Sequence, residues 1–216
     1  GQHAGQRFVI KDGLKEGEKV VTRGAFKLDS ELQIQGKKGS MMSLPGEESE
    51  ASQVPSAFVE ALSPVYKAYF GVWSGLKEDQ PAAVKESAAH LVSALDEVHG
   101  GLLEASLKGH WDSVSESLKS NAEAISATED IKTQREHFYP LSKAMLELER
   151  RFGHAGAATH HEMFCPMALN DKGAIWLQPD DELLNPYFGA SMLHCGEQRE
   201  AFTPRESTTA GQPHVH

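Results

Sequence analysis

Apolar side chains recur every three or four residues between residues 54 and 156, the spacing that places them on one face of an α-helix. Four such stripes follow one another, with short connections between them. The apolar positions are Phe58, Leu62, Val65, Tyr69, Trp73 and Leu76, then Val84, Ala88, Leu91, Leu95 and Val98, then Trp111, Val114, Leu118, Ala122 and Ile125, and last Ile131, Phe138, Leu141, Met145, Leu148 and Phe152. Four amphipathic helices on short connections predict an antiparallel four-helix bundle.

Proline, glycine and small polar residues indicate where these helices begin and end. Pro64 interrupts the first stripe, so we expect either a kink there or a new helix capped by Ser63. Thr128 is the expected N-cap of the fourth helix, and Gly153 lies just beyond its end. These signals set the expected bounds of the first and fourth helices.

The residues before the helices favour β structure. Residues 1–44 contain short β-branched runs, such as Phe8 to Ile10 and Val20 to Thr22, which are punctuated by glycines. So few apolar positions cannot close a core of their own, and we interpret this segment as the remnant of a larger β domain. Residues 45–53 are typical of a linker, because they combine proline, glycine and serine with several glutamates.

The residues after the helices predict a small cap on the bundle. Residues 157–200 contain an apolar run at 173–178 that precedes Pro179, and we expect this run to be a strand that returns beneath an earlier one. Residues 201–216 are polar, so we expect a disordered tail. The predicted fold is therefore mainly α with a small β part, in which a four-helix bundle over residues 54–156 carries a short, sulfur-rich cap.

Composition and charge exclude several classes of function. The 216 residues carry a formal net charge of −10, which argues against a nucleic-acid partner. No stretch approaches the roughly 20 apolar residues that a membrane span needs. The sequence contains no nucleophile elbow, phosphate loop, dinucleotide fingerprint or metalloprotease helix motif, so we expect no enzyme. Residue 1 is a glycine without signal-peptide features after it, so either a signal peptide was removed or the chain is a piece of a longer protein.

Sulfur is concentrated in the predicted cap. Met163, Cys165 and Met167 alternate, so they would share one face of an extended segment. Met192 and Cys195 lie three residues apart and would share a face of one helical turn. Thiolate and thioether sulfur selects soft monovalent ions over hard cations. The sequence therefore predicts a site for Cu(I) or Ag(I) with these five residues as ligands.

The same residues admit other interpretations. Cys165 and Cys195 could form a structural disulfide, because closing a loop of this size contributes on the order of 3 to 4 kcal/mol in the chain-entropy model. A zinc site with two cysteines and two histidines could add His161 and His194, although zinc does not usually take thioether ligands. The cysteines could also cycle between dithiol and disulfide, but the chain lacks a Cys-x-x-Cys pair.

Two resemblances to known families place these features in a context. Residues 13–21, GLKEGEKVV, and residues 24–31, GAFKLDSE, resemble the membrane-proximal part of periplasmic adaptor proteins of copper/silver efflux systems of the resistance-nodulation-division type. Residues from about 55 to 200 resemble a helical domain of uncharacterised function, which occurs alone in exported bacterial proteins or fused behind such adaptors. The matching motifs are FYPLS at 138–142, CPMA at 165–168, GAIWLQ at 173–178, NPYFG at 185–189 and MLHCG at 192–196.

The resemblances imply a periplasmic location and two partners, an inner-membrane pump and other adaptor protomers. We therefore expect an efflux adaptor component whose C-terminal domain binds Cu(I) or Ag(I), and either delivers the ion to the pump or regulates it. The rival hypothesis is a disulfide-stapled structural or protein-interaction module that binds no metal. The hairpin, lipoyl-like and β-barrel domains of a complete adaptor are not present in this sequence.

Overall fold

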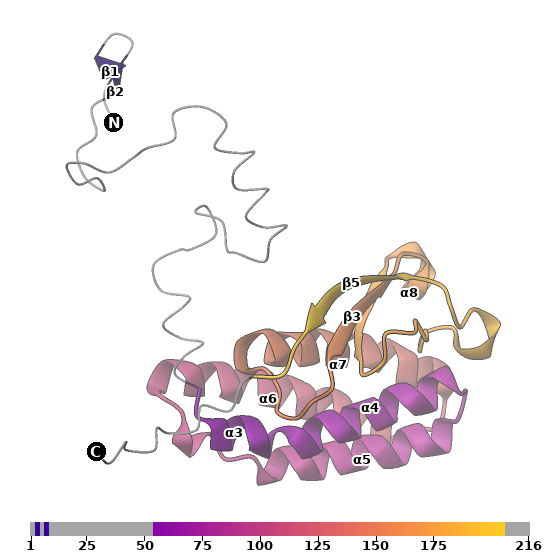
Figure 1. The fold of residues 1–216 in the computed structure, drawn as a ribbon. Helices are drawn as coiled ribbons and strands as arrows, with labels where there is room; N and C mark the ends of the chain where they lie inside the picture. The colour runs from indigo at the N-terminus through magenta and orange to yellow at the C-terminus, as the bar shows by residue number, and fades with distance from the viewer. Residues whose placement is uncertain (1–2, 5–6, 9–53, 206–216) are drawn as a thin grey trace. The chain divides into compact units, whose positions relative to one another are not determined.

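The computed structural model describes residues 3–4, 7–8 and 54–205 (Figure 1). The chain divides into two compact units, Gly1–Ser49 and Glu50–His216. In the first unit, strand β1 (His3–Ala4) pairs antiparallel with strand β2 (Arg7–Phe8). The rest of the predicted β segment 1–44, and the predicted linker 45–53, lie outside the described residues.

The second unit is mainly helical and carries a small antiparallel sheet. Its helices are α3 (Ser56–Ala61), α4 (Ser63–Lys77), α5 (Pro81–Glu97), α6 (Ala105–Ser126), α7 (Ile131–Phe152) and the short α8 (Ala168–Asp171). Two short 3₁₀ turns, η1 (Gly100–Leu102) and η2 (Gly189–Ser191), lie before α6 and after α8. The apolar stripes predicted from the sequence are buried, apart from the partly buried Ile131. Consecutive long helices contact one another, α4 with α5, α5 with α6 and α6 with α7. Among the described residues, no helix combines the length and apolar character that crossing a bilayer requires.

The observed helix ends differ in part from those expected. The predicted restart at Pro64 is confirmed, because α3 ends at Ala61 and α4 begins at Ser63. Ser63 is already helical, however, and Leu62 occupies the N-cap position without a side-chain cap. The prediction of Thr128 as the cap of α7 is also wrong. The Asp130 carboxylate accepts the Thr133 N–H at 2.9 Å and caps the helix, while Thr128 Oγ1 accepts the Asp130 N–H at 3.0 Å.

The sheet consists of β3 (His160–Cys165), β4 (Ala174–Gln178) and β5 (Glu197–Phe202), in the order β4-β3-β5 with antiparallel neighbours. The strand expected at 173–178 is thus present and pairs with β3. The polar tail was expected to begin at residue 201, but β5 continues to Phe202 and the Arg205 N–H donates to the His154 carbonyl at 2.9 Å. The sheet therefore extends beyond the predicted cap, and residues 206–216 lie outside the described part of the chain.

Tyrosine hydroxyls attach the sheet to the helices. The Tyr69 hydroxyl, from α4, accepts the Leu177 N–H of β4 at 3.1 Å and shares a hydrogen bond with Ser142 of α7 at 2.9 Å. The Tyr187 hydroxyl donates to the Ile175 carbonyl at 2.8 Å. Figure 1 shows the orange and yellow strands on one side of the helices, near α4 and α7. Two backbone groups of β4, the Leu177 N–H and the Ile175 carbonyl, are therefore bonded to side chains, whereas residues of β5 are mostly exposed.

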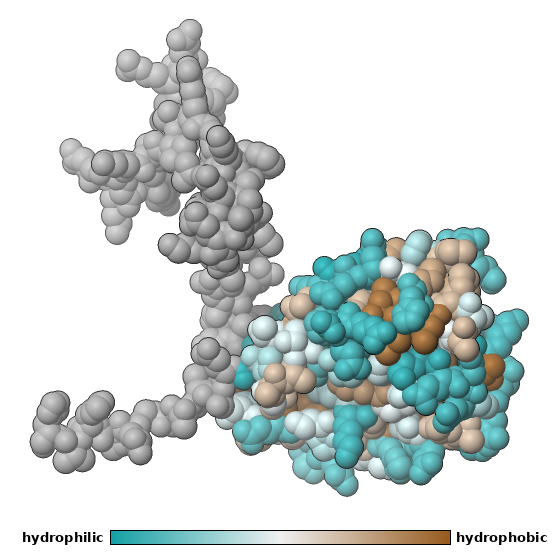
Figure 2. Space-filling model, turned by 45° about the vertical axis from the view of Figure 1, so that its right-hand side comes forward, coloured by the Kyte–Doolittle hydropathy of each residue, from teal (hydrophilic) through white to brown (hydrophobic). Residues whose placement is uncertain are grey.

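The surface seen in Figure 2 is mostly hydrophilic, with one compact hydrophobic area on the face shown. Exposed large hydrophobic side chains in the described residues include Leu102, Met167 and Met192. Two of these three are methionines of the predicted sulfur site. Their exposure means that hydrophobic burial does not explain their presence.

Candidate metal centres

The structure brings the two cysteines together at one end of β3. Cys165 is the last residue of β3 and is buried, whereas Cys195 follows the short turn η2 (Gly189–Ser191) and is half-buried. Both are free thiols, and their Sγ atoms lie 3.1 Å apart. A disulfide bond would place them about 2.05 Å apart. The hydrogen bond with Cys165, with a further effect of burial, raises the pKa of the Cys195 thiol.

The predicted methionine ligands are distributed differently from the sequence expectation. Met167 Sδ lies 4.0 Å from Cys195 Sγ, so this thioether belongs to the cysteine cluster. Met163 does not share that exposed position, because it is fully buried in the hydrophobic core. Met192 lies in the loop, exposed, and its carbonyl accepts the Cys195 N–H at 3.2 Å, which forms the turn expected between them. Because β3 ends at Cys165, the predicted alternation does not continue to Met167.

The two histidines of the alternative zinc site have other surroundings. His161 lies in β3 four residues before Cys165, which corresponds to about 13 Å along an extended strand. The Nδ1 atom of His161 is buried and makes no hydrogen bond. His194 is exposed, and its Nδ1 lies 3.0 Å from the Leu183 carbonyl. The separation of His161 from the cysteines argues against a zinc site built from all four residues.

Backbone and amide contacts hold the loop that carries Cys195. The buried Asn185 side chain donates from Nδ2 to the Cys195 carbonyl at 2.7 Å, and the Asn185 N–H donates to the Leu193 carbonyl at 2.7 Å. Gly196 follows with φ +140°, and a Cβ atom at that position would lie 2.6 Å from the Phe164 carbonyl oxygen. The close approach of these two backbones is what places Cys195 against Cys165, and it requires glycine.

The same loop is tied to the helices through Asp79, which follows α4. The Asp79 carboxylate accepts the Ala190 N–H at 3.0 Å and pairs with Arg135 of α7 at 2.5 Å. The hydrogen bond from Ala190, together with the hydrogen bond and charge of Arg135, lowers the pKa of Asp79 against the opposing effect of burial. The beginning of η2 is therefore fixed to α4 and α7.

A second cluster, which the sequence did not single out, lies at the opposite end of β3. It consists of Glu149 in the last turn of α7, His154 in the connection after the helix, and His160 at the start of β3. Glu149 Oε1 lies 2.6 Å from His154 Nδ1, and Oε2 lies 3.1 Å from His160 Nδ1. All three residues are buried, and one potential ligand atom from each lies within 4.8 Å of the others, so the group could hold a metal ion.

Burial and hydrogen bonding determine the charges in this cluster. Burial opposes ionisation of Glu149, but hydrogen bonds from both histidines lower its pKa to about 2. Burial likewise opposes the charged form of His154, yet the bond to Glu149 raises its pKa overall. For His160 the effect of burial prevails, and its pKa is lowered. The two imidazole rings stack with centroids 3.6 Å apart. Because the two pKa values shift in opposite directions, His154 holds its proton more strongly than His160 does beside the same buried carboxylate.

Aromatic and backbone groups enclose this cluster. The Tyr66 ring lies 5.0 Å from the ring of His160 and 5.9 Å from that of His154, and its hydroxyl donates to the Gly153 carbonyl at 3.0 Å. The Nε2 atom of His154 lies 2.8 Å from the Ala158 carbonyl. A signal for the cluster was present in the sequence, because Glu149 lies four residues after Met145 and so places a carboxylate on an apolar helix face.

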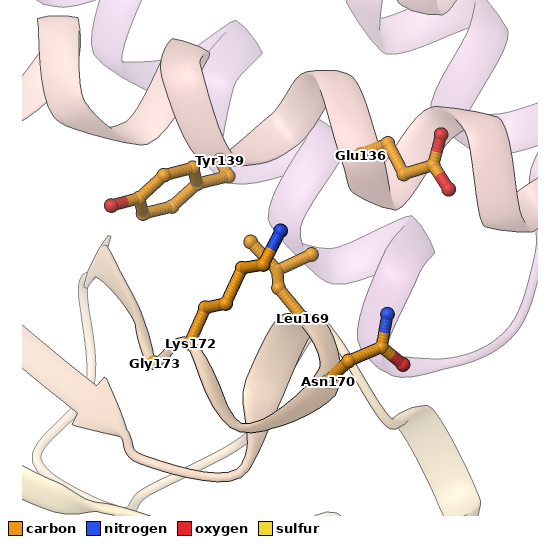
Figure 3. Close-up of a pocket in the computed structure, with 6 residues that line it drawn as sticks. All are labelled: Glu136, Tyr139, Leu169, Asn170, Lys172 and Gly173. Atoms are coloured by element: carbon orange, nitrogen blue, oxygen red, sulfur yellow. The ribbon is translucent and has the colours of Figure 1, made fainter.

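A separate pocket lies between α7 and the short helix α8 (Ala168–Asp171). It has a volume of about 430 Å³ and is lined by Glu136, Tyr139, Leu169, Asn170, Lys172 and Gly173 (Figure 3). Figure 3 shows the Lys172 side chain extending toward α7, between Tyr139 and Glu136. None of these lining residues is a candidate metal ligand.

Comparisons with known proteins support only a limited assignment. A model of a family described as a protein of unknown function (DUF3347) matches residues 65–156, a segment that includes α5, α6, α7 and most of α4. Glu149 and His154 fall inside the matched segment, whereas His160 and both cysteines follow it. No curated protein and no solved structure matches the chain.

Proposed function

We propose that this chain binds a copper-group ion, Cu(I) or Ag(I), through Cys165, Cys195 and Met167. The observation that carries this proposal is the meeting of two free thiols, with Sγ atoms 3.1 Å apart, and a thioether 4.0 Å from one of them. Soft sulfur ligands of this kind select monovalent copper-group ions. Met163 and Met192, which were also predicted as ligands, are outside the proposed site because one is a core residue and the other has only a backbone contact with Cys195.

Entry of the ion requires two local changes. Metal–sulfur bonds are about 2.3 Å long, so two thiolates on one ion stand further apart than the present 3.1 Å. Cys195 is on a loop and half-buried, so it is the residue that moves outward. Both thiols must also release their protons, whereas the Met167 thioether has none to lose. Binding at this site should therefore depend on pH and on the movement of the Cys195 loop.

The scaffold in this proposal is an antiparallel four-helix bundle formed by α4, α5, α6 and α7. Contacts between consecutive helices and the short connections between them support that arrangement. The sheet packs against the bundle through α7 and the Tyr69 side chain of α4, and Cys165 lies in the sheet. In this arrangement the helices are the rigid support, and the loop of Cys195 is the adjustable part.

For the biological context, we propose a periplasmic adaptor of a heavy-metal efflux system, with an inner-membrane pump and other adaptor protomers as partners. Support comes from the resemblance of residues 13–31 to such adaptors, a segment outside the described residues. The bound ion would be passed to the pump or would regulate it. A net charge of −10 is unfavourable for a nucleic-acid partner and favourable for attracting cations.

The short sulfur–sulfur distance also favours a second function, a disulfide-stapled structural or interaction module. Oxidation of Cys165 and Cys195 would join two thiols into one S–S bond and release two protons and two electrons to an oxidant such as oxidised glutathione. The bond would close a loop between residues 30 positions apart. Such a loop contributes on the order of 3 to 4 kcal/mol in the chain-entropy model.

Copper binding is tested on the reduced full chain by competition with a chromophoric Cu(I) chelator. We expect about one ion per chain, and the double substitution Cys165→Ser and Cys195→Ser should weaken binding by at least about 100-fold, since even substitutions next to the ligands of metal sites cost 10–100-fold. Met167→Leu should weaken it by roughly 10-fold, a loss of about 1.4 kcal/mol. Met192→Leu, which removes an exposed methionine of the same loop, is the matched control and should change nothing. If the double variant binds Cu(I) as tightly as the parent chain does, the proposed sulfur site is wrong.

The two functions are separated by comparing oxidised and reduced samples of one preparation. If the cysteines bind the ion, the oxidised chain should contain no free thiol and should bind Cu(I) much more weakly. Its free energy of unfolding should rise by about 3 to 4 kcal/mol. Thiol counting, Cu(I) titration and urea unfolding measure these quantities. An oxidised chain that binds copper as tightly as the reduced chain would assign the cysteines to the disulfide alone.

A further inference from the structure

The cluster of Glu149, His154 and His160 has a donor chemistry that the sulfur site does not use. Imidazole nitrogen and carboxylate oxygen suit borderline and harder divalent ions, whereas Cu(I) and Ag(I) favour sulfur. The cluster also lies five residues away from Cys165 along β3, a distance of about 17 Å in an extended strand. One ion cannot bridge the two groups. Any ion in this cluster is therefore a second ion.

The geometry points to a binding site for one divalent ion of the zinc type, with Glu149, His154 and His160 as its three protein ligands. The Nδ1 atoms of both histidines already face the same carboxylate, at 2.6 Å and 3.1 Å. Zinc binds imidazole nitrogen and carboxylate oxygen at about 2.0–2.2 Å, so small shifts of three side chains admit the ion. Two histidines and one glutamate leave a fourth position for a water molecule.

The surroundings of His154 favour a ligand role. Its Nε2 atom lies 2.8 Å from the Ala158 carbonyl, which can only accept a hydrogen bond, so Nε2 carries a proton. The Nδ1 atom is then the coordinating nitrogen, and the backbone carbonyl orients the ring. An imidazole whose second nitrogen donates to a carbonyl is the usual arrangement around a metal-bound histidine. In this site the ion replaces the proton between His154 and Glu149.

The ion would join three separate parts of the chain. Glu149 belongs to α7, His154 to the connection that follows it, and His160 to β3. The His154 carbonyl also accepts the Arg205 N–H, which brings in the segment after β5. The ion therefore fastens the sheet to the last turn of α7, at a position where all three ligand side chains are buried. We assign it a structural role, in which binding raises the stability of the folded state.

The test uses the full chain with four substitutions that remove other donors: Cys165→Ser, Cys195→Ser, His214→Gln and His216→Gln. This parent variant is titrated with Zn²⁺ against a chromophoric chelator, and with Co²⁺ as a spectroscopic probe. We expect one ion per chain, visible d–d bands of Co²⁺ without a thiolate charge-transfer band, and a higher melting temperature with Zn²⁺. A folded parent variant that binds neither ion overturns the proposal.

Ligand identity is tested in the same background. Glu149→Gln and His160→Gln should each lower the Zn²⁺ affinity by at least about 100-fold, since even outer partners of metal ligands contribute 10–100-fold. The matched controls are Glu147→Gln, at an exposed position of the same helix, and His90→Gln, at an exposed position of α5. Both controls should keep the parent affinity. Unchanged affinity in either ligand variant, checked for helical structure by circular dichroism, overturns the assignment. Loss of Cu(I) binding in the parent variant bears only on the sulfur site.

Discussion

The two ends of strand β3 carry two candidate metal centres of opposite character. At its first residue, His160 is buried together with Glu149 and His154, and both imidazoles are hydrogen-bonded to the Glu149 carboxylate. At its last residue, Cys165 meets the half-buried Cys195 of a mostly exposed loop, beside the exposed Met167. One end is preorganised by packing, and the other is adjustable. Under the two proposals made above, one strand would hold a structural ion at its first residue and a copper-group ion at its last.

The difference follows from what each end requires of the folded state. A buried carboxylate is costly unless its neighbours satisfy it, so the cluster at His160 is coupled to the stability of the whole unit. Two thiols are nearly apolar and need no such compensation. We therefore expect substitutions at the first end to lower the free energy of unfolding. Substitutions of the two cysteines at the second end should change thiol oxidation and Cu(I) affinity, with little effect on stability.

The largest expected effect is that of Glu149→Ala in the metal-free chain. The substitution leaves His154 in a buried position without its carboxylate partner, and breaking a buried ion pair in this way costs about 3–5 kcal/mol. Urea unfolding in the presence of a chelator measures the loss. Glu147→Ala, on the exposed side of α7, should stay within about 0.5 kcal/mol of the parent. A loss below about 1 kcal/mol for Glu149→Ala would show that the cluster is not coupled to folding.

An intermediate effect is expected for Gly196→Ala at the sulfur end. The added Cβ would lie 2.6 Å from the Phe164 carbonyl oxygen, in a backbone with φ +140° that alanine rarely adopts. Such strain costs about 1–3 kcal/mol, and the relief of it moves Cys195 away from Cys165. Disulfide formation should slow and Cu(I) affinity fall, while Zn²⁺ affinity stays unchanged. Gly109→Ala, in an open position of α6, should instead stabilise the chain by about 0.5–1 kcal/mol. Unaltered thiol oxidation in Gly196→Ala would contradict this account of the loop.

The smallest expected effect is a dependence on pH at Asp79, which fixes the start of the sulfur loop. Because its pKa in the folded chain is lowered from the ordinary 3.8, Asp79 contributes stability above that pH. The contribution is lost as the pH falls through the lowered value. The side chain is 42% exposed, so the contribution is modest. We expect the parent to be more stable than Asp79→Asn at neutral pH, and the difference to vanish in acid. A difference in urea unfolding that does not change with pH would rule out an ionised role for Asp79.

The helices were predictable because their signal is local. The burial of residues such as Leu91 and Leu118 is predicted by their spacing along their own helix, without reference to any distant residue. Strand β5 gave no comparable signal, since Glu197 to Phe202 are nearly all exposed and the strand forms only by pairing with β3. Hydrogen bonding to a distant segment is not visible in the residues of the strand itself.

The candidate sites also differ in how far local sequence signals could predict them. The sequence predicted Cys165 and Cys195 as members of one site, and their Sγ atoms do lie close together. The separation of Met163 from Met167 was not predicted, because it depends on where β3 ends. The cluster of Glu149 and the two histidines needs a helix end, a connection and a strand start to meet. Only tertiary packing sets that meeting.

The tyrosine hydroxyls that bond to β4 also bear on whether the sheet can pair with a strand of another chain. Tyr69 and Tyr187 occupy hydrogen-bonding groups of β4 that another polypeptide would need for pairing. The opposite strand, β5, presents Glu197, Arg199 and Glu200, whose charges discourage pairing with a second copy. Extension of the sheet by another chain is therefore opposed at β4 by the tyrosine hydroxyls and at β5 by the charged side chains. The sheet can therefore stay at three strands although it does not close into a barrel.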